Sequence, residues 1–165
     1  MDSSQVIQRV TRHLVLVVIC GIWALPAWAK GGKVLVQDLA ARGVEVHEAA
    51  SIATASCTAL AQRKGYDVLC GDDLRAMIKW NTMAATFNNC ADASCMSTTA
   101  KAMKARFVVS GSVAKVGDAF VLTLSMLDVK KGKTRGRAEV KADSLGSLYK
   151  QVPEAVDVLV GSGRK

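Results

Sequence analysis

The sequence predicts an α+β fold of two layers, in which a mixed sheet has helices packed on one face. Three observations indicate this class. Residues 107–129 are typical of a β-hairpin, because two runs of β-branched and aromatic residues flank a short connection. Residues 44–64 and 145–159 carry apolar side chains every three or four positions, as in helices that pack one stripe on a sheet. The expected order of elements is β-α-β-α-α-β-β-β-α.

The hairpin at Phe107 to Val129 is the most clearly patterned part of the chain. Gly117 and Asp118 lie in its connection, where a tight turn needs residues that tolerate positive φ angles. In the second strand one face is fully apolar and the other is mixed. The apolar residues are Phe120, Leu122, Leu124 and Met126. An apolar face predicts a cover of helices.

The first 29 residues are typical of a secretory signal peptide. Arg9 and Arg12 precede an apolar run over residues 14–25, and residues 27–29 form an Ala-x-Ala cleavage motif. An uncleaved membrane anchor is the alternative reading. The apolar run is, however, shorter than the ~20 residues that a spanning helix needs.

Cleavage before Lys30 would leave a single domain over residues 30–160 and a flexible tail over residues 161–165. Half of the residues are apolar, which is enough for a hydrophobic core, and the length fits one domain. The expected compartment of the cleaved protein is the periplasm.

Four cysteines remain after this cleavage, and an oxidising compartment favours disulfides between them. Cys90 and Cys95 lie close together in a polar stretch, so we expect them to close a small loop. Cys57 and Cys70 are then left as a second pair by elimination, with buried free thiols as the alternative. A zinc site is disfavoured, because Cys57 and Cys70 are too far apart in sequence to form a ligand pair.

The amino-terminal half alternates short strands with helices. We expect a strand at Val34–Val36, a turn at Ala40–Gly43, a helix over residues 44–64 and a strand at Tyr66–Cys70. Gly65 is suited to the carboxyl cap of the helix.

Two further helices are expected before the hairpin, over Leu74–Phe87 and Ser94–Lys104. Asp72 and Asp73 precede the first of them, where carboxylates accept backbone N–H bonds and suit the helix dipole. The alternative role for these two residues is general acid and base catalysis.

After the hairpin, residues 134–142 read as an edge strand that is kept from pairing with other molecules by its charged side chains. A last helix begins near Asp143 and Ser144, and its apolar stripe ends at Leu159. Pro153 is expected to begin a separate segment or to kink this helix.

The formal net charge is +8, and part of the excess is local. Basic residues cluster at and after the second turn, and the possible binding patch consists of Lys130, Lys131, Lys133, Arg135 and Arg137. Such a patch could attract an anionic membrane, an anionic polymer or an acidic protein. A solvated turn is the alternative. Nucleic acid is not an expected partner, because no aromatic residues are interleaved for base stacking.

Several stretches together resemble a known family. They are Val34–Leu39, Gly65–Leu69, Asp72–Leu74, the loop from Asn89 to Cys95, and Arg106–Val113. The chain resembles the small periplasmic α/β domain at the amino end of TolB, and more loosely the related domains of curli-secretion and penicillin-binding-protein-activator lipoproteins. The resemblance implies an exported, non-enzymatic module that docks other envelope proteins. No β-propeller is expected within these 165 residues, so the resemblance does not imply the roles that depend on the propeller of TolB.

The function expected from the sequence is therefore that of a periplasmic interaction module for envelope proteins or polymers. A small periplasmic enzyme or a ligand carrier is the alternative. His47 is the one histidine outside the expected leader and fits an exposed helix start, and no hydrolase, metalloprotease or phosphate-loop motif occurs. No cofactor and no metal are expected, and the sequence does not predict the oligomeric state.

Overall fold

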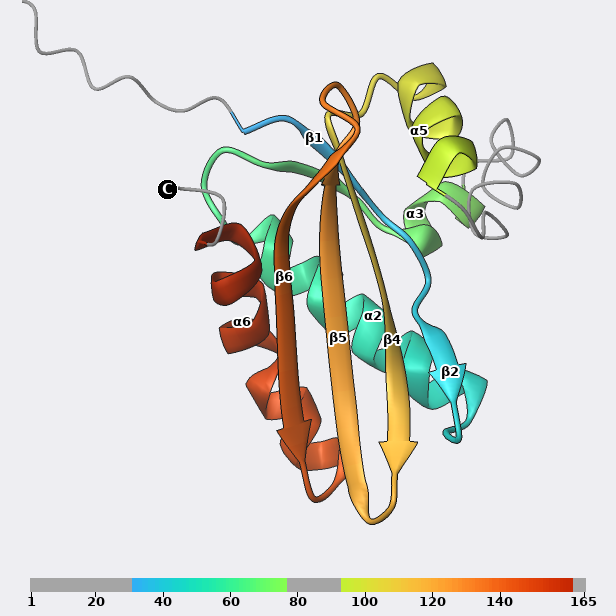
Figure 1. Cartoon of the computed structure of the whole chain (residues 1–165), viewed down its shortest axis with the longest axis vertical. Coiled ribbons are helices and arrows are strands. Elements are labelled where there is room, and N and C mark those ends of the chain that lie inside the picture. Colours follow the sequence, from blue (N-terminus) through green and yellow to red (C-terminus); the bar gives the residue numbers. More distant parts are fainter. Residues whose placement is uncertain (1–30, 77–92, 162–165) are drawn as a thin grey trace, which may run out of the picture.

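The computed structural model describes residues 31–76 and 93–161. Its elements are β1 (Lys33–Val36), β2 (Ala40–Arg42), α2 (Val46–Ala61), β3 (Asp67–Leu69), α3 (Gly71–Ala76), α5 (Ala93–Ala102), β4 (Phe107–Val116), β5 (Ala119–Asp128), β6 (Lys133–Ala142) and α6 (Leu145–Gly161). The strands form one sheet in the order β3-β1-β4-β5-β6, and β2 pairs with β4 beyond the end of β1. Helices α2 and α6 lie together behind this sheet (Figure 1). The expected two-layer α+β class is confirmed.

The sheet is mixed because its two halves are connected differently. Strands β4, β5 and β6 are antiparallel neighbours, whereas β1 runs parallel to both β3 and β4. The turn between β4 and β5 consists of Gly117 and Asp118, and Gly117 has a φ of 61°. Glycine adopts this angle without a steric penalty, so the short connection predicted from the sequence forms the expected hairpin.

The main core lies between the sheet and helices α2 and α6. On β5, Leu122, Leu124 and Met126 are fully buried, and Phe120 is half-buried at the end of the strand. The helices contribute Leu60 and several residues of α6, and the buried residues of α6 are Leu148, Val152, Ala155, Val156, Leu159 and Val160. Burying a side chain of this size stabilises the fold by about 1.5–3 kcal/mol. The apolar face predicted for the hairpin therefore forms the sheet side of the main core.

A second, smaller cluster lies on the opposite face of the sheet. Leu35 and Val108 point away from the main core, because successive residues of a strand face opposite sides. They pack with Val129 and with Ala100 and Met103 at the end of α5. Helix α5 therefore covers one end of the face that α2 and α6 leave open (Figure 1).

One predicted turn is wrong. Residues Ala40–Arg42 form strand β2, which pairs in parallel with Ser112–Ala114 of β4. The N–H of Gln37 donates to the carbonyl of Val109 at 2.9 Å, and this bond keeps the chain beside β4 between β1 and β2. The reversal comes later, at Gly43, whose φ is 69°. The observed order of the described elements thus contains one strand more than predicted.

Helix α6 is a single helix with Pro153 inside it, so the predicted separate segment does not form. Buried residues lie on both sides of the proline, which holds the two parts of the helix on the same core. Gly161, which was assigned to the tail, is the last residue of α6. No helix within residues 31–76 and 93–161 has the length and apolar character that crossing a membrane requires.

Some predictions lie outside the described residues. They concern the leader over residues 1–29, the segment from residue 77 to Phe87, and Cys90. The remaining predicted helices are present, with α2 two residues shorter at its start and three at its end than the predicted range 44–64.

Candidate functional site

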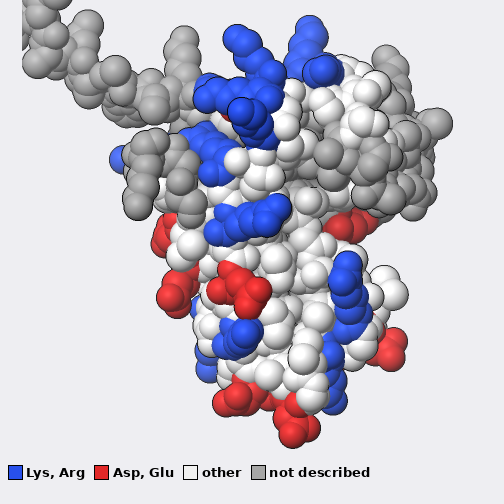
Figure 2. Space-filling view, in the orientation of Figure 1, with Lys and Arg blue, Asp and Glu red and all other residues white. Residues whose placement is uncertain are grey.

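The basic residues predicted as a binding patch lie at one end of the sheet, around the turn between β5 and β6. Lys130, Lys131, Lys133 and Arg137 are exposed, and Arg135 is half-buried. Figure 2 shows Lys and Arg side chains gathered at this upper end of the molecule. We call these five residues, together with Lys33, Lys104 and Arg106, the basic end.

Backbone hydrogen bonds between strands place Lys33 and Arg106 beside the turn. The N–H of Arg106 donates to the carbonyl of Lys33 at 2.8 Å, and the N–H of Val129 donates to the carbonyl of Arg106 at 2.9 Å. Lys33, Arg106 and Val129 therefore lie side by side at the same end of three neighbouring strands. Lys104, which is exposed, lies just before this row.

A buried ring supports two of the guanidinium groups. The guanidinium carbon of Arg106 lies 5.0 Å from the ring centre of Phe107, and that of Arg135 lies 4.7 Å from the same centre. Tyr66 meets the ring edge-on, with centres 6.2 Å apart. Each cation–π contact stabilises by about 0.5–1 kcal/mol at an exposed site. The ring therefore offsets the repulsion between two like charges and keeps both at the basic end.

The turn itself is ordered by a buried carboxylate. Asp128 is 6% exposed, and its Oδ1 accepts the N–H of Lys131 at 2.9 Å. Its carbonyl accepts the N–H of Gly132, which has a φ of 62°. Nearby, Lys33 Nζ lies 3.9 Å from Asp67 Oδ2. The basic end is thus a concentrated region of positive charge on a defined backbone.

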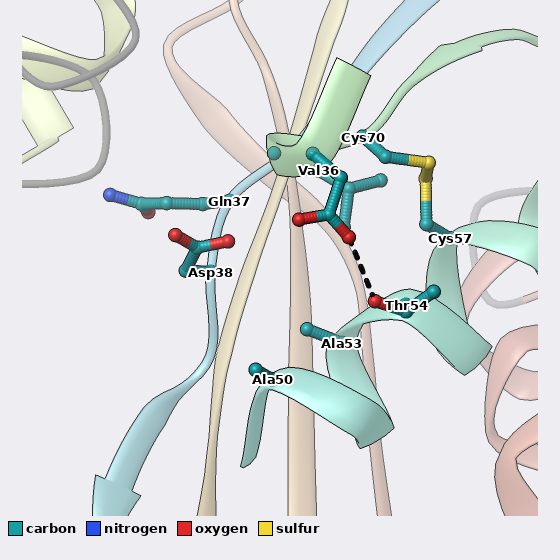
Figure 3. Close-up of a pocket in the computed structure, with 10 residues that line it drawn as sticks. Val36, Gln37, Asp38, Ala50, Ala53, Thr54, Cys57 and Cys70 are labelled. Carbon is teal, nitrogen blue, oxygen red and sulfur yellow. Dashed lines mark hydrogen bonds between the residues drawn. A yellow bond between two sulfur atoms is a disulfide. The ribbon is translucent and has the colours of Figure 1, made fainter. Parts of the chain in front are cut away.

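A small cavity lies elsewhere, at the carboxyl ends of the parallel strands β1 and β3 (Figure 3). Its lining includes Gln37, Asp38, Thr54 and Asp72. The Thr54 hydroxyl donates to Asp72 Oδ2 at 3.1 Å, a bond that spans the cavity wall. Its volume is about 10 Å³, which is at the lower limit for one water molecule. The cavity therefore has no room for a substrate or a cofactor.

Asp72 and Asp73 have structural partners at the start of α3. Asp73 Oδ2 accepts the N–H of Cys70 at 3.1 Å, and Asp72 accepts the Thr54 hydroxyl as described above. This arrangement agrees with the predicted role of carboxylates at a helix start. No group of three or more metal-ligating side chains lies together in the part of the chain that the structure describes.

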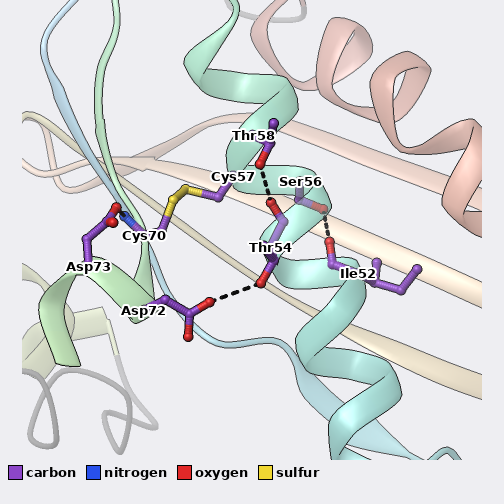
Figure 4. The surroundings of a disulfide bond; sticks show 8 residues. All are labelled: Ile52, Thr54, Ser56, Cys57, Thr58, Cys70, Asp72 and Asp73. Atoms are coloured by element: carbon purple, nitrogen blue, oxygen red, sulfur yellow. Dashed lines mark hydrogen bonds between the residues drawn. A yellow bond between two sulfur atoms is a disulfide. The ribbon is translucent and has the colours of Figure 1, made fainter. Parts of the chain in front are cut away.

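Two of the cysteines form a disulfide. Cys57 on the buried side of α2 is bonded to Cys70 at the end of β3, with their Cα atoms 5.8 Å apart (Figure 4). This is the pairing that elimination indicated, and free buried thiols are wrong here. Cys95 is also disulfide-bonded. Cys90 lies outside the described residues, so its bridge to Cys95 stays a prediction.

A wide groove runs between helices α2 and α6 on the side away from the sheet. Ser51, Ala55 and Thr58 line one wall, and Tyr149 and Pro153 line the other. The space measures about 560 Å³ and is open to solvent. The groove exists because the α2 residues along it have small side chains. Its lining includes no charged residue that would select a ligand.

Sequence reasoning found the residues of the turn but missed Lys33, Lys104 and Arg106. These residues are distant from the turn in sequence, and strand pairing alone brings them there. The strand that begins at Phe107 was predicted. The position of Arg106 just before this strand was therefore the sequence signal that could have placed it at the basic end.

The fold and the basic end define a small α+β domain with a charged end, and solved structures share this fold. The LpoB carboxyl-terminal domain from Salmonella enterica aligns with a TM-score of 0.54 at 16% identity, over 76% of this chain and 93% of that one. Lipoprotein GNA1162 from Neisseria meningitidis aligns with a TM-score of 0.54 at 16% identity, over 74% and 94%. TolB from Acinetobacter baumannii aligns more weakly, with a TM-score of 0.48 at 18% identity, over 79% and 29%.

These likenesses concern the fold. The first two confirm the fold resemblance that the sequence indicated. No protein-family model matches the sequence, and no curated protein has a matching sequence.

Proposed function

We propose that this protein is an exported, non-catalytic module of the cell envelope that binds an acidic region of a partner protein through its basic end. The observation that carries the proposal is the convergence of eight basic side chains at one end of the sheet, from β1, from the segment just before β4, from the turn after β5 and from β6. Positive potential concentrated in this way attracts and orients an acidic partner.

Export is supported by the disulfides and by the leader-like first segment. The Cys57–Cys70 bridge persists in an oxidising compartment such as the periplasm. Residues 1–29 have the composition of a cleavable signal peptide. The shared fold with a Neisseria lipoprotein is consistent with an envelope location.

A binding role is favoured over an enzymatic one by the form of the sites. The cavity beside the disulfide is too small for a substrate, and its carboxylate Asp72 is engaged by Thr54. His47 is exposed at the start of α2, away from the disulfide cysteines. The basic end offers charge and surface instead, which is what docking requires.

The test is crosslinking in intact cells, followed by identification of the captured molecule. The variant replaces Lys130, Lys131, Lys133, Arg135 and Arg137 with glutamine, and should lose the captured protein that the parent chain retains. Added salt should reduce capture by the parent chain in the same way, because salt at 0.1 M screens exposed charges beyond about 10 Å.

The matched control replaces Lys115 and Arg42 with glutamine. Both residues are exposed and lie away from the basic end, and Lys115 belongs to the opposite end of β4. This control should capture the same protein as the parent chain. Equal capture by the five-residue variant would refute the proposal, and capture of phospholipid in place of protein would assign the basic end to a membrane surface.

A further inference from the structure

Two arginines of the basic end are held over one aromatic ring. The guanidinium carbons of Arg106 and Arg135 lie over the Phe107 ring, at 5.0 and 4.7 Å from its centre. Arg106 comes from the segment just before β4, whereas Arg135 belongs to β6. The tertiary structure therefore makes these two guanidinium groups neighbours, although they are far apart in the sequence.

The ring that holds the two groups is fixed in the core. Phe107 is fully buried, and Tyr66 meets its ring edge-on. In the sheet Phe107 pairs with Val34 of β1 on one side and with Asp128 of β5 on the other. Side chains that are already ordered lose less conformational freedom when a ligand binds. The ring therefore prearranges both guanidinium groups for a ligand.

The stem of Arg106 packs closely on the chain that leads into β1. A Cβ atom on Gly32 would lie 2.6 Å from both Cβ and Cδ of Arg106, which is too close for non-bonded carbon atoms. A larger residue at Gly32 would therefore displace the Arg106 side chain. The position of this guanidinium group depends on a glycine that carries no charge itself.

Arg135 is positioned by an irregularity in the pairing of β6. The register shifts between Met126 and Leu127, whose partners are Gly136 and Thr134, so Arg135 is an extra residue without a partner of its own on β5. An extra residue of this kind redirects a side chain from the regular alternation of the strand. The shift allows the Arg135 guanidinium group to lie over the buried ring on the main-core side of the sheet.

We propose that Arg106 and Arg135 form a paired guanidinium site, which binds carboxylate groups of an acidic partner segment through bidentate hydrogen bonds. This inference rests on the proposed function and names the residues that make its binding selective. A guanidinium group presents its N–H donors as a planar fork that matches the two oxygens of a carboxylate. A lysine ammonium is a strongly hydrated point charge. The lysines of the basic end therefore attract the partner, and the two arginines recognise its carboxylates.

A protein carboxylate fits the basic end better than a membrane surface does. Elements that lie on membranes combine basic residues with exposed apolar side chains that enter the bilayer. In the described part of the chain, none of the large exposed apolar residues belongs to the basic end. These residues are Val46, Val116, Tyr149 and Val158.

The first test changes the shape of the two groups without changing their charge. It uses the full-length chain as the cell produces it, a glutamate-rich peptide and isothermal titration calorimetry. The double variant Arg106→Lys with Arg135→Lys should bind the peptide about tenfold more weakly, because lysine lacks the planar fork. The matched control is Arg42→Lys, which changes an exposed arginine at the end of β2 and should leave the affinity unchanged.

The outcomes of this test separate the paired site from the proposed function. Equal affinity of the parent chain and the double lysine variant would overturn the paired site, while the proposed function, which needs only positive charge, would stand. Failure of the peptide to bind the parent chain at low salt would refute the proposed function and the paired site together.

A second test observes the guanidinium groups directly. Saturating peptide should shift the Nε–H resonances of Arg106 and Arg135 in the NMR spectrum of the labelled chain, because a hydrogen bond to a carboxylate changes their environment. The resonance of Arg42 is the internal control and should stay in place. Unshifted resonances of the two arginines at saturating peptide would overturn the proposal.

A third test displaces Arg106 without altering any charged residue. Gly32→Ala should weaken peptide binding several-fold, because its Cβ forces the arginine stem to move. The control is Gly146→Ala, where a Cβ meets nothing within 4 Å, and its affinity should equal that of the parent chain. Unchanged binding by Gly32→Ala would contradict the prearranged position of Arg106.

A last comparison uses vesicles of an anionic phospholipid in place of the peptide. The parent chain should bind the peptide and should not distinguish itself from the double lysine variant on vesicles. Weaker vesicle binding by the double lysine variant, with no difference on the peptide, would assign the pair to phosphate groups and overturn the carboxylate site.

Discussion

At Gly111 the backbone of β4 lies so close to β5 that no larger residue fits. A Cβ atom there would overlap the backbone oxygen of Thr123 and lie 3.1 Å from the Leu39 side chain. Gly111→Ala should therefore lower the free energy of unfolding by about 1–3 kcal/mol, because the two central strands must separate. Urea unfolding followed by circular dichroism measures the change.

Gly146→Ala is the control for this prediction. Gly146 lies in the first turn of α6, and a Cβ there meets nothing within 4 Å. Alanine should stabilise the helix by about 0.5–1 kcal/mol, since glycine loses more backbone entropy on folding. Equal stability of the two variants would contradict the close approach at Gly111.

The bridge between Cys57 and Cys70 makes a second prediction for single residues. It closes a loop with a sequence separation of 13, so its removal should cost about 3 kcal/mol. Cys57→Ala, Cys70→Ala and the double variant should all lose a similar amount, because either change removes the same bond. Urea unfolding provides the three values. Additive losses in the double variant would show that the cysteines act separately.

For single residues, the sequence predicted some structural roles and missed others. The cysteine pair could be found by elimination, since only four cysteines follow the leader. Gly111 could not, because its constraint arises from the register of β4 against β5, which involves residues of both strands. Turn glycines are different: the need of Gly117 for a positive φ is local and was visible in the sequence.

Helices α2 and α6 are joined at one end by an arginine. Arg63, just after α2, donates from Nε to Asp157 Oδ1 at 2.6 Å and from Nη2 to the carbonyl of Pro153 at 3.3 Å. The carboxylate is 62% exposed, so solvent screens the pair strongly. Double replacement with alanine in a thermodynamic cycle should give a coupling energy of about 0.5 kcal/mol that falls as salt is raised.

Arg63→Lys provides the control for this contact. Lysine keeps the charge but cannot donate from a planar group to Asp157 and Pro153 together. It should recover less than the full coupling in the same urea unfolding measurements. Full recovery by lysine would mean that charge alone joins the two helices.

Among the elements, strong periodicity made prediction reliable, and weak or very short patterns did not. The β4–β5 hairpin and helices α2 and α6 follow their apolar patterns closely. Strand β2 has three residues and no alternation to detect, and its pairing with β4 is set by the preceding strand. Helix α5 packs on the sheet face opposite α2 and α6, against Leu35 and Val108. Which face of the sheet a helix covers is decided by tertiary packing, so the local sequence pattern of α5 could not predict it.

The whole molecule has a distinctly basic end, which strand pairing assembles from segments far apart in the sequence. Only the residues of the β5–β6 turn could be predicted as a group, because they are contiguous. Lys33 and Arg106 join them through backbone bonds between strands. The acidic side chains in Figure 2 lie mostly away from this end, so the field of the molecule is uneven.

An uneven field should act mainly on the rate of association. Replacing Lys130, Lys131 and Lys133 with glutamine should lower the association rate constant for a glutamate-rich peptide by about tenfold at low salt. The dissociation rate should change less, because exposed charges at the rim of a binding surface act mainly on the approach of the partner. Stopped-flow fluorescence over a salt series measures both constants, with Lys115→Gln as the control. A change confined to dissociation would place these lysines in direct contact with the bound peptide, where they would act by holding it and not by steering its approach.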